Sequence, residues 1–427
     1  MAKKILLWYR NDLRISDHEA LHEAVTSGAE ILPVYVDHPT DYSQYLPGNP
    51  ETPGFRRKFQ LESLQNLDQQ WRSWNTSLIV LPGKPEDVIP ELCSKYSIDE
   101  VFLQAEAAHD EFQQQRKLER NLSAIQVPWK YFFGASMIHP DDLPFDLHDL
   151  PDIFTQYRKR VEARLKIRDC FPTPTKVEVV PHQESEFVPQ FPETQLDPRC
   201  ALAFQGGETE AQKRLHSYLW ESDSLRNYKE TRNGLIGADY SSKFSAWLAN
   251  GCLSARQVFH EVKKYEASRI ANDSTYWLIF ELLWRDYFRL VLEKFGTDLF
   301  SLEGITARKQ KQPQGLDIVK FHKWINGKTG NRFIDANMIE LKRTGFMSNR
   351  GRQNVASYFV HDLGMDWRLG AWYFEAVLLD YDVYSNWGNW AYVAGVGNDP
   401  RENRYFNTAR QADMYDADGA YRKLWLD

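Results

Sequence analysis

The sequence has few cysteines and no long apolar run. Its four cysteines are scattered along 427 residues, at Cys93, Cys170, Cys200 and Cys252, and no two form a CxxC pair. A disulfide framework, a zinc site and an iron–sulfur site are therefore not expected, and we predict no metal. No apolar stretch approaches the roughly eighteen residues of a membrane helix. Residues 1–10 suit a first strand better than a signal peptide, which predicts a cytoplasmic protein that does not enter a membrane.

An excess of positive charge and a dinucleotide-binding fingerprint are also missing. The formal net charge is −7, so the overall charge does not favour a nucleic-acid partner, and DNA binding would need a local basic patch. Residues 342–352 (KRTGFMSNRGR) contain four cations and no acid, although a solvated turn is the alternative interpretation. No GxGxxG motif follows the first expected strand, so the dinucleotide fingerprint of a doubly wound sheet is absent.

The first part of the chain alternates strand-like and helix-like patterns. Short apolar runs predict buried strands, and the periodic segments between them predict helices. Alternation of this kind is typical of a doubly wound parallel sheet. The expected strands are 5–8, 31–36, 77–81, 101–104 and 127–133, and the expected helices lie near 17–27, 54–74, 85–96 and 109–124.

The rest of the chain changes character twice. Residues 171–200 contain six prolines and almost no periodicity, which indicates a long connector, and beyond about Glu208 the pattern is helical nearly to the end. The length allows two domains, each with its own core. We therefore predict an α/β protein with a doubly wound parallel-sheet domain at 1–135, a connector at 136–207 and an all-helical domain at 208–427. The expected helices of the last domain are 208–220, 245–250, 254–267, 274–295, 317–326, 334–343, 350–363 and 368–379.

A serine cluster precedes one of the short expected helices. Within residues 228–254 (YKETRNGLIGADYSSKFSAWLANGCLS), Ser241, Ser242 and Ser245 surround Lys243. The free N–H groups and the positive dipole end of a helix N-terminus suit a phosphate. N-capping by Ser245 is the plain structural alternative and would explain one serine. Three hydroxyls beside a lysine favour a phosphate-binding segment.

A second motif lies in residues 276–288 (YWLIFELLWRDYF). On a helix, Trp277, Glu281, Trp284 and Arg285 share one face because they are spaced by three or four residues. An Arg285–Glu281 surface pair above an aromatic core stripe is the structural alternative, and the pattern alone favours it slightly.

The third and most informative segment runs from residue 345 to residue 398. It sets Asn349, Arg350 and Arg352, and the group Asp380, Asp382 and Asn386, beside four tryptophans. Aromatic content is 14% overall, and ten of the fourteen tryptophans lie after residue 200. A buried planar redox ring needs such a mixture, because its nitrogens require directional partners and its faces require apolar walls. Helix capping by the aspartates is the alternative, and three polar positions together make it the weaker one.

These segments resemble the DNA photolyase/cryptochrome family, and their wording is most similar to its cryptochrome-DASH branch. The likeness covers essentially the whole chain and is strong at residues 143–162, 227–245 and 393–407. It implies that the helical domain binds FAD. It also implies light-driven repair of cyclobutane pyrimidine dimers, in which reduced FAD gives an electron to the dimer and recovers it after ring splitting. One departure is Asn331-Arg332, which replaces an expected Tyr-Pro with no predictable effect.

The resemblance implies a set of flavin contacts. Arg352 matches an arginine that pairs with Asp380 beside the flavin ring, and Asp382 matches a contact to the ring edge or ribityl chain. Asn386 matches the residue that faces flavin N5, where a neutral amide tolerates the anionic reduced ring better than a carboxylate would. The match to the pyrophosphate-binding segment comprises Tyr228, Ser241, Ser242, Lys243, Phe244 and Ser245, and the remaining implied contacts are Glu281, Arg285 and Asn349.

The resemblance also implies how the lesion is held. Glu281 matches the acid that hydrogen-bonds a flipped dimer, and Trp284 matches the ring that packs on it. A carboxyl group in an apolar pocket has a raised pKa and can donate a hydrogen bond to a thymine carbonyl. Asn349 and Asn386 complete the implied catalytic set.

Two substitutions point to single-stranded DNA as the partner. Gln353 and Tyr392 stand where conventional dimer photolyases carry Met and Trp, so the apolar clamp on the dimer is weaker. A weaker pocket cannot offset the few kcal/mol needed to unstack a base from a duplex. Histidines that a (6-4) photolyase needs at Asn349 and Gln353 are absent. The residues implied to contact DNA are Trp284, Lys342, Arg343, Arg350, Gln353 and Tyr392, with Lys243 as a further phosphate contact.

The resemblance implies an electron-transfer chain of tryptophans. Trp390 and Trp367 match its first two members, but the usual outermost position is Gln314. Photoreduction would then end at Trp367 or leave through Trp324, Tyr392 or another surface aromatic. The alternative is that these rings are simply core residues.

Some expectations remain open at this level. Asp110 and Glu111 match residues that contact a folate, which implies a methenyltetrahydrofolate antenna held by Glu111, although the segment alone resembles an acidic helix start. A blue-light photoreceptor that signals without repair is the first rival function. A non-catalytic flavoprotein that binds nucleic acid is the second. We expect a monomer.

Overall fold

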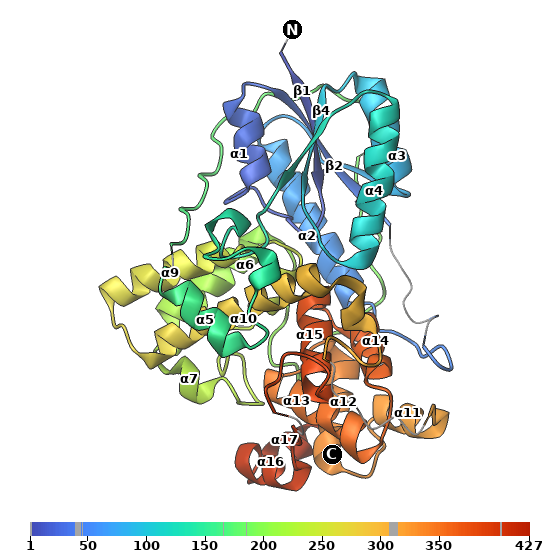
Figure 1. The fold of residues 1–427 in the computed structure, drawn as a ribbon, viewed down its shortest axis with the longest axis vertical. Coiled ribbons are helices and arrows are strands. Elements are labelled where there is room, and N and C mark those ends of the chain that lie inside the picture. Colours follow the sequence, from blue (N-terminus) through green and yellow to red (C-terminus); the bar gives the residue numbers. More distant parts are fainter. Residues whose placement is uncertain are drawn as a thin grey trace.

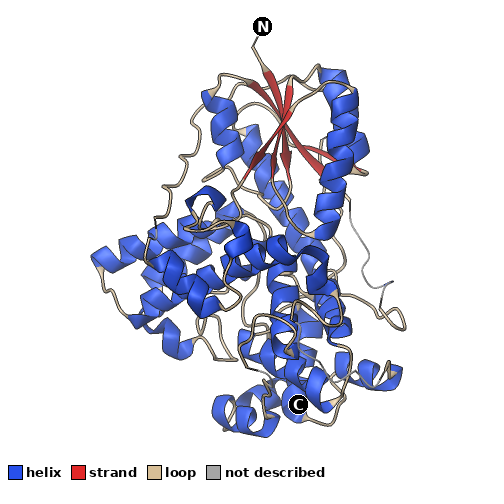
Figure 2. Ribbon diagram, in the orientation of Figure 1, coloured by secondary structure: helices blue, strands red, loops and turns tan. Residues whose placement is uncertain are grey.

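The computed structural model describes residues 2–38, 44, 46–164, 166–184, 186–306, 315–401 and 404–427. Gln314, which bears on the photoreduction route, lies outside the described residues. Figure 1 shows a sheet domain that carries the N-terminus, and a larger helical body that carries the C-terminus. Figure 2 shows that the strands gather in the sheet domain and that helices make up the rest. No helix in the described part of the chain is long and apolar enough to cross a membrane.

The N-terminal domain is a five-stranded parallel sheet with the strand order β3-β2-β1-β4-β5. The chain moves outward from β1 through β2 and β3, and then returns to the other side of β1 with β4 and β5. This order confirms the predicted doubly wound sheet. The strands are β1 (Lys4–Tyr9), β2 (Glu30–Asp37), β3 (Ile79–Pro82), β4 (Glu100–Gln104) and β5 (Trp129–Phe132).

Helices cover both faces of the sheet, so β1 is apolar and buried from Ile5 to Tyr9. Its alternate residues face opposite layers: Leu7 and Tyr9 pack with residues of α1 and α2, whereas Leu6 and Trp8 pack with residues of α3 and α4. Figure 1 shows α1 on one side of the sheet and α3 and α4 on the other. These helices are α1 (Glu19–Thr26), α2 (Phe55–Arg72), α3 (Pro85–Tyr96) and α4 (His109–Ala124).

The segment between the sheet and the helical body is more structured than its proline content indicated. It contains α5 (Phe154–Glu162) and two short 3-10 helices at Pro140–Asp142 and Leu147–Asp149. Farther on, Val180 donates its N–H to the Ile31 carbonyl, and Ile31 donates to the Glu178 carbonyl, so the proline-rich chain runs beside β2. The sequence did not predict α5, because it stands between two stretches without helical periodicity.

The helical body is organised around α10 (Asp273–Phe295). Asn272 begins this helix with a capping box to Thr275. The other helices are α6 (Glu208–His216), α7 (Tyr228–Thr231), α8 (Ser245–Ala249), α9 (Ala255–Ser268), α11 (Ile318–Ile325), α12 (Arg332–Thr344), α13 (Asn349–Ser357), α14 (Trp367–Val377), α15 (Val383–Ala394), α16 (Thr408–Tyr415) and α17 (Ala420–Leu426). Of these, α7, α15, α16 and α17 were not predicted. Single turns of π-helix extend α6 and α13, at Ser217–Glu221 and Tyr358–Asp362.

Asn331 accounts for the unexplained Asn331-Arg332 pair. Its side-chain oxygen caps α12 by accepting the N–H groups of Phe333 (3.2 Å) and Ile334 (3.3 Å), while its Nδ2 donates to Thr408 Oγ1 at 2.8 Å. Asn331 thus begins one helix and holds the start of α16 against it.

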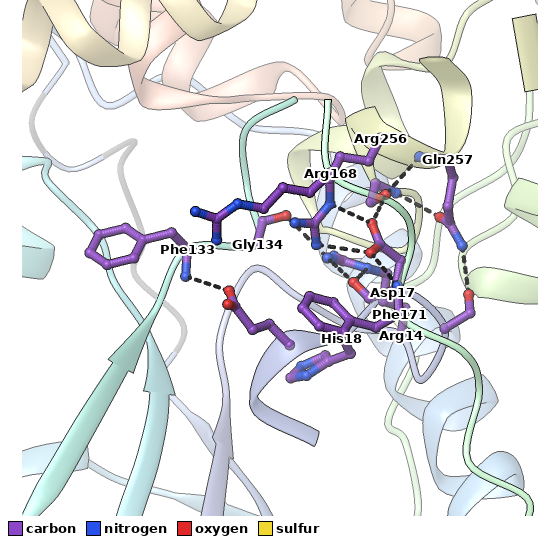
Figure 3. Close-up of polar contacts among 12 residues, drawn as sticks. Arg14, Asp17, His18, Phe133, Gly134, Arg168, Phe171, Arg256 and Gln257 are labelled. Atoms are coloured by element: carbon purple, nitrogen blue, oxygen red, sulfur yellow. Dashed lines mark hydrogen bonds and ion pairs between the residues drawn. The ribbon is translucent and has the colours of Figure 1, made fainter. Parts of the chain in front are cut away.

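A buried ionic cluster joins the sheet domain to the helical body. The fully buried Asp17 carboxylate accepts hydrogen bonds from Arg256 Nη2 (2.8 Å), Ser254 Oγ (2.5 Å) and the Phe171 N–H (3.1 Å). Arg14 donates to the carbonyls of Gly251 (2.8 Å) and Asp17 (3.0 Å). Figure 3 shows the side chains of Arg14, Asp17 and Arg256 turned toward one another. The mutual pairing compensates the cost of burying three charges. We call Arg14, Asp17, Ser254 and Arg256 the Asp17 cluster.

Candidate flavin and lesion cavity

A cavity of about 420 Å³ opens in the helical body. Its size lies within the roughly 300–1,000 Å³ of most ligand pockets. The described residues of α8, α10, α13 and α15 and of the loop before α8 form its wall. The implied flavin and lesion residues that line it are Tyr228, Ser241, Ser242, Lys243, Phe244, Ser245, Glu281, Trp284, Arg285, Asn349, Arg352, Gln353, Asp380, Asp382, Asn386, Trp390 and Tyr392. The structure therefore brings four distant sequence segments together at one cavity.

The serine loop is held in shape by Arg214, a buried residue of α6. Its guanidinium donates to the carbonyls of Ser242 (3.0 Å) and Ser241 (3.1 Å), and to a carboxylate oxygen of Asp239 (2.7 Å). The helix α8 begins at Ser245, and no side chain caps it, so capping does not explain the serines. Sequence reasoning missed Arg214, because its contacts lie more than twenty residues away and no local pattern marks them.

Lys243 has a strained backbone and a buried amine. Its φ of 56° is in the left-handed region, which non-glycine residues rarely adopt. The Nζ donates to the Ala238 carbonyl at 2.9 Å and lies 3.3 Å from the centroid of the Tyr240 ring. Burial, helped by the nearby Arg214 charge, lowers the pKa of Lys243 to about 7. Only 3% of the residue is exposed, so the expectation that Lys243 contacts DNA phosphates is wrong.

Arg352 and Asp380 form an ion pair on the cavity wall. Arg352 Nη2 lies 2.8 and 3.0 Å from the two carboxylate oxygens of Asp380, and Arg352 Nε donates to the Met347 carbonyl at 2.9 Å. The Asp380 side chain is buried, whereas Arg352 keeps a quarter of its surface exposed. The pair thus joins α13 to the segment before α15 and presents a guanidinium edge to the cavity.

Asp382 and Asn386 stand one turn apart on α15. Asp382 caps this helix by accepting the Ser385 N–H at 2.7 Å, so capping is one of its roles. The buried Asn386 donates its Nδ2 to the Ala371 carbonyl at 3.0 Å. Because only the NH₂ end of an amide can donate to a carbonyl, this bond fixes the side-chain orientation and leaves Oδ1 as the group able to accept a hydrogen bond at the cavity.

Glu281 pairs with Arg232, and not with Arg285. The Arg232 Nη1 donates to Glu281 Oε1, whereas Arg285 donates to the carbonyls of Ala135 (2.5 Å) and Leu248 (3.2 Å). The Arg285–Glu281 surface pair, which was the structural alternative for this motif, is therefore absent among the described contacts. Burial raises the pKa of Glu281 above its usual range, and the Arg232 charge offsets part of that rise. Arg232 also lines the cavity and was not predicted, although it lies in the family-like segment 227–245.

Trp284 is held between two aromatic neighbours. Phe154 of α5 stacks on it with centroids 3.7 Å apart and planes 11° apart, and Tyr392 meets it edge-on at 5.8 Å. Tyr392 in turn accepts a hydrogen bond from Arg404 Nη2 at 2.8 Å, and Arg404 is paired with the buried Asp399. The sequence singled out neither Arg404, which also lines the cavity, nor Phe154, which packs on Trp284 from α5.

The implied DNA-phosphate contacts Lys342, Arg343 and Arg350 are not among the residues that line the cavity. Arg350 is half-buried and donates to Gln353 Oε1 (2.8 Å) and Asn233 Oδ1 (2.9 Å). Lys342 and Arg343 are exposed in the last turn of α12 and are not part of the cavity wall. Asn349 and Ser245 are exposed residues at the wall.

The implied electron-transfer tryptophans do not form one row. Trp390 lines the cavity and lies 6.3 Å from Trp324, measured between ring centroids. Trp367 contacts Trp387 at 5.7 Å instead. Because Trp324 is fully buried, the expectation that an electron leaves the protein at this ring is wrong.

Glu111 lies away from this cavity, in the first turn of α4. Burial and the neighbouring Glu106 carboxylate raise its pKa to about 7. No cluster of three or more His, Cys, Asp or Glu side chains that could hold a metal ion occurs among the described residues.

The donor set of the cavity suits a dinucleotide with a planar ring. Guanidinium groups and serine hydroxyls can bind phosphate oxygens. Asp380, Asp382 and Asn386 offer directional partners to ring and ribityl groups, and Leu248, Phe288 and Phe374 give apolar surface.

Comparison with known proteins shows which protein family this chain resembles. Residues 277–427 match the FAD-binding domain of DNA photolyase, and residues 5–178 match the DNA photolyase domain. A curated cryptochrome DASH from Synechocystis sp. is 47% identical, with 99% of this chain and 87% of the relative covered. Another from Gloeobacter violaceus is 48% identical over 100% of this chain and 86% of the relative.

Solved structures agree with the sequence relatives. A Synechocystis sp. cryptochrome has a TM-score of 0.94 and 46% identity over 100% of this chain and 89% of that one. A class III photolyase from Agrobacterium tumefaciens has a TM-score of 0.83 and 25% identity over 100% of this chain and 86% of that one. The chain belongs to the cryptochrome-DASH branch of the DNA photolyase/cryptochrome family, and the predicted resemblance and fold class are confirmed.

Proposed function

We propose that this flavin-based protein repairs cyclobutane pyrimidine dimers in single-stranded DNA under blue light. The observation that carries the proposal is that Glu281 and Trp284 line the same cavity as Asn386 and the Arg352–Asp380 pair. A dimer held by the first two residues would lie beside a flavin held by the others. FAD, when bound and reduced, supplies the electron that splits the dimer.

Each residue has a part in this proposal. The flavin phosphates bind at Ser241, Ser242 and Ser245, in the loop that Arg214 fixes. Arg352 and Asp380 would hold the polar edge of the flavin ring, and Asn386 would offer its Oδ1 to the ring as a hydrogen-bond acceptor.

A second group of cavity residues, Glu281 and Trp284, holds the lesion. Glu281 donates a hydrogen bond to a thymine carbonyl when protonated, which its raised pKa favours. Trp284 supplies a flat apolar surface for the flipped bases. When the dimer enters, Arg232 must release the Glu281 carboxylate and bind a DNA phosphate or a water molecule instead.

The polar side chains of Gln353 and Tyr392 support a preference for single-stranded DNA. Gln353 is bound to Arg350, and Tyr392 to Arg404, so both present polar groups where an apolar clamp would grip a flipped base. A duplex lesion must first lose its stacking, which costs a few kcal/mol, whereas a single strand has already lost it. Lys342, Arg343 and Arg350 would contact phosphates, so DNA affinity falls with salt.

A folate antenna at Glu111 is part of the proposal. The half-buried carboxyl group with its raised pKa could donate a hydrogen bond to a pterin-like ring. A light sensor that signals without repair is the second candidate, and the cryptochrome names of the relatives favour it.

The test is blue-light repair by reduced protein of a thymine dimer in matched single-stranded and duplex oligonucleotides. Repair of the single strand alone is the expected result. Equal repair of both would overturn the single-strand preference. Absence of repair in both, with FAD bound and reducible, would favour the sensor. A Glu281→Gln variant separates these functions, because it should lose repair and keep flavin photoreduction.

A further inference from the structure

We propose that electrons enter this protein from the surface at Trp372 and pass through Trp387 toward the cavity. The inference rests on the proposed flavin function and names the route by which the bound flavin is reduced. It concerns residues of α14 and α15 that lie outside the lesion wall.

The three outer rings form a continuous path. Trp387 meets Trp367 with centroids 5.7 Å apart and planes at 78°, and meets Trp372 at 6.3 Å and 74°. Trp372 is 40% exposed, whereas Trp387 and Trp367 are buried. Indole is the most easily oxidised apolar side chain, so successive rings at contact distance can exchange one electron. Trp372 is the member of the path that meets solvent.

The inner end of the path is Trp390. It stands three residues after Trp387 on α15, a spacing that brings the Cβ atoms of two helix residues within about 5–6 Å of each other. Gly370 lets the Trp390 ring pack directly on α14, because a Cβ there would lie 2.2 Å from ring atom Cη2. Trp367 stands one turn before Gly370 on the same helix. Trp387 is therefore next to Trp390 along α15 and in contact with Trp367 on α14.

The competing branch through Trp324 stays inside the protein. Within the described part of the chain, Trp324 contacts the rings of Phe359, Tyr373, Phe374 and Trp390, and all of these are buried. None of these neighbouring rings is exposed, so none of them could pass an electron from solvent to an oxidised Trp324.

Glu375 gives the path a proton partner. Trp387 Nε1 donates to Glu375 Oε2 at 3.1 Å. An indole that has lost one electron is a strong N–H acid, so its proton can shift to the carboxylate and return when the ring is reduced again. This exchange stabilises the oxidised ring without losing a proton to solvent.

The electrons and protons balance with an external thiol as the reductant. Trp390 would give one electron to a photoexcited oxidised flavin bound in the cavity, Trp387 would refill Trp390, and Trp372 would refill Trp387. The thiol then gives one electron to Trp372 and releases its own proton to solvent, which leaves every tryptophan as it began.

The test compares Trp372→Phe, Trp387→Phe and Trp324→Phe in the FAD-loaded full chain, with Trp129→Phe on β5 as a matched control. Flavin content is measured first by absorbance. Blue-light reduction of the flavin with a thiol is then timed, and a nitroso spin trap followed by peptide mass spectrometry locates the radical. We expect Trp372→Phe and Trp387→Phe to slow reduction roughly tenfold, the other two variants to stay within roughly twofold, and the wild-type adduct to lie on Trp372.

The outcomes separate this inference from the flavin function. A Trp372→Phe variant with the wild-type rate, or an adduct on a different residue, would overturn the route. Failure of the wild type to bind FAD would instead overturn the proposed function. A Glu375→Gln variant should shorten the lifetime of the neutral tryptophan radical in transient absorption while leaving flavin content unchanged.

Discussion

Arg232, at the end of α7, pairs with Glu281 of α10 across the cavity wall. The pair opposes the effect of burial on the carboxyl group, because a nearby cation favours the charged form. A bound dimer favours the protonated form of Glu281, whereas Arg232 favours the charged form, so the two compete for this carboxyl group.

The first prediction concerns this pair. Glu281→Gln should lower single-strand repair by at least roughly tenfold, since one directed hydrogen bond is weakened in the reacting complex. Arg232→Met should raise the pKa of Glu281 further. The repair rate at saturating substrate, which falls as pH rises through that pKa, should then fall at higher pH than in the wild type. Unchanged pH profiles in Arg232→Met would show that Glu281 does not act as a proton donor.

Removing Arg352 should loosen flavin binding and the fold together. Arg352→Met leaves the Asp380 carboxylate, only 1% exposed, without its cation, which costs about 3–5 kcal/mol for buried pairs. Thermal unfolding and flavin retention on a desalting column measure both effects. Arg332→Met is the control, because the Arg332–Asp427 pair is 61% and 62% exposed and contributes at most about 1 kcal/mol. Equal losses in both variants would contradict the prediction.

Glu340 of α12 should make stability depend on pH. Burial raises its pKa to about 7, and the Tyr421 hydroxyl that donates to it opposes the rise. An unfolded glutamate titrates near about 4.3, so between these values only the folded chain holds the proton. The stability from this group is complete below about pH 4.3 and is lost as pH rises to about 7.

The Glu340→Gln variant should remove that slope, which we expect to be on the order of a few kcal/mol. Urea unfolding at several pH values measures it. Tyr421→Phe keeps the carboxyl group and removes the opposing hydrogen bond, so the loss of stability should extend to higher pH. Identical slopes in wild type and Glu340→Gln would rule out this carboxyl as the cause.

An apolar clamp should restore repair in duplex DNA. The Gln353→Met and Tyr392→Trp double variant replaces two hydrogen-bonded polar side chains with apolar surface, which offsets part of the few kcal/mol needed to flip the lesion. Repair of the single strand is the internal control and should change little. A duplex rate that stays at the wild-type level would mean that another feature limits base flipping.

The sequence predicted the sheet well because local patterns decide it. The three central strands, β1, β2 and β4, are short and mostly apolar runs that are buried along most of their length, and Pro85 begins α3 as expected. Helix α15 was missed although Val383, Trp387 and Trp390 are spaced by four and three residues, because its serine, asparagine and glycine residues are poor helix formers. Packing against α10 and α14, which no local pattern reveals, makes it helical.

In the candidate site, too, the sequence predicted what local motifs mark and missed what only tertiary contacts create. Family-like motifs found the wall residues that are close in sequence, such as Arg352 and Asp380. Arg214 and Arg404 act through carbonyls and a tyrosine hydroxyl on other segments, so neither carries a recognisable motif. Helical spacing alone offered Arg285, one turn away, as a partner for Glu281, but tertiary structure supplies Arg232 from 49 residues away.

The Asp17 cluster also bears on how the molecule can be divided. Its carboxylate comes from the sheet domain, and its serine and one of its guanidinium groups come from the start of α9. A fragment ending after β5 would lack the Ser254, Arg256 and Gly251 groups that Asp17 and Arg14 bind, and with them the contacts that join the two parts. We infer that the two parts melt as one cooperative unit. Truncated versions should therefore expose protease sites in both parts instead of yielding an intact sheet domain.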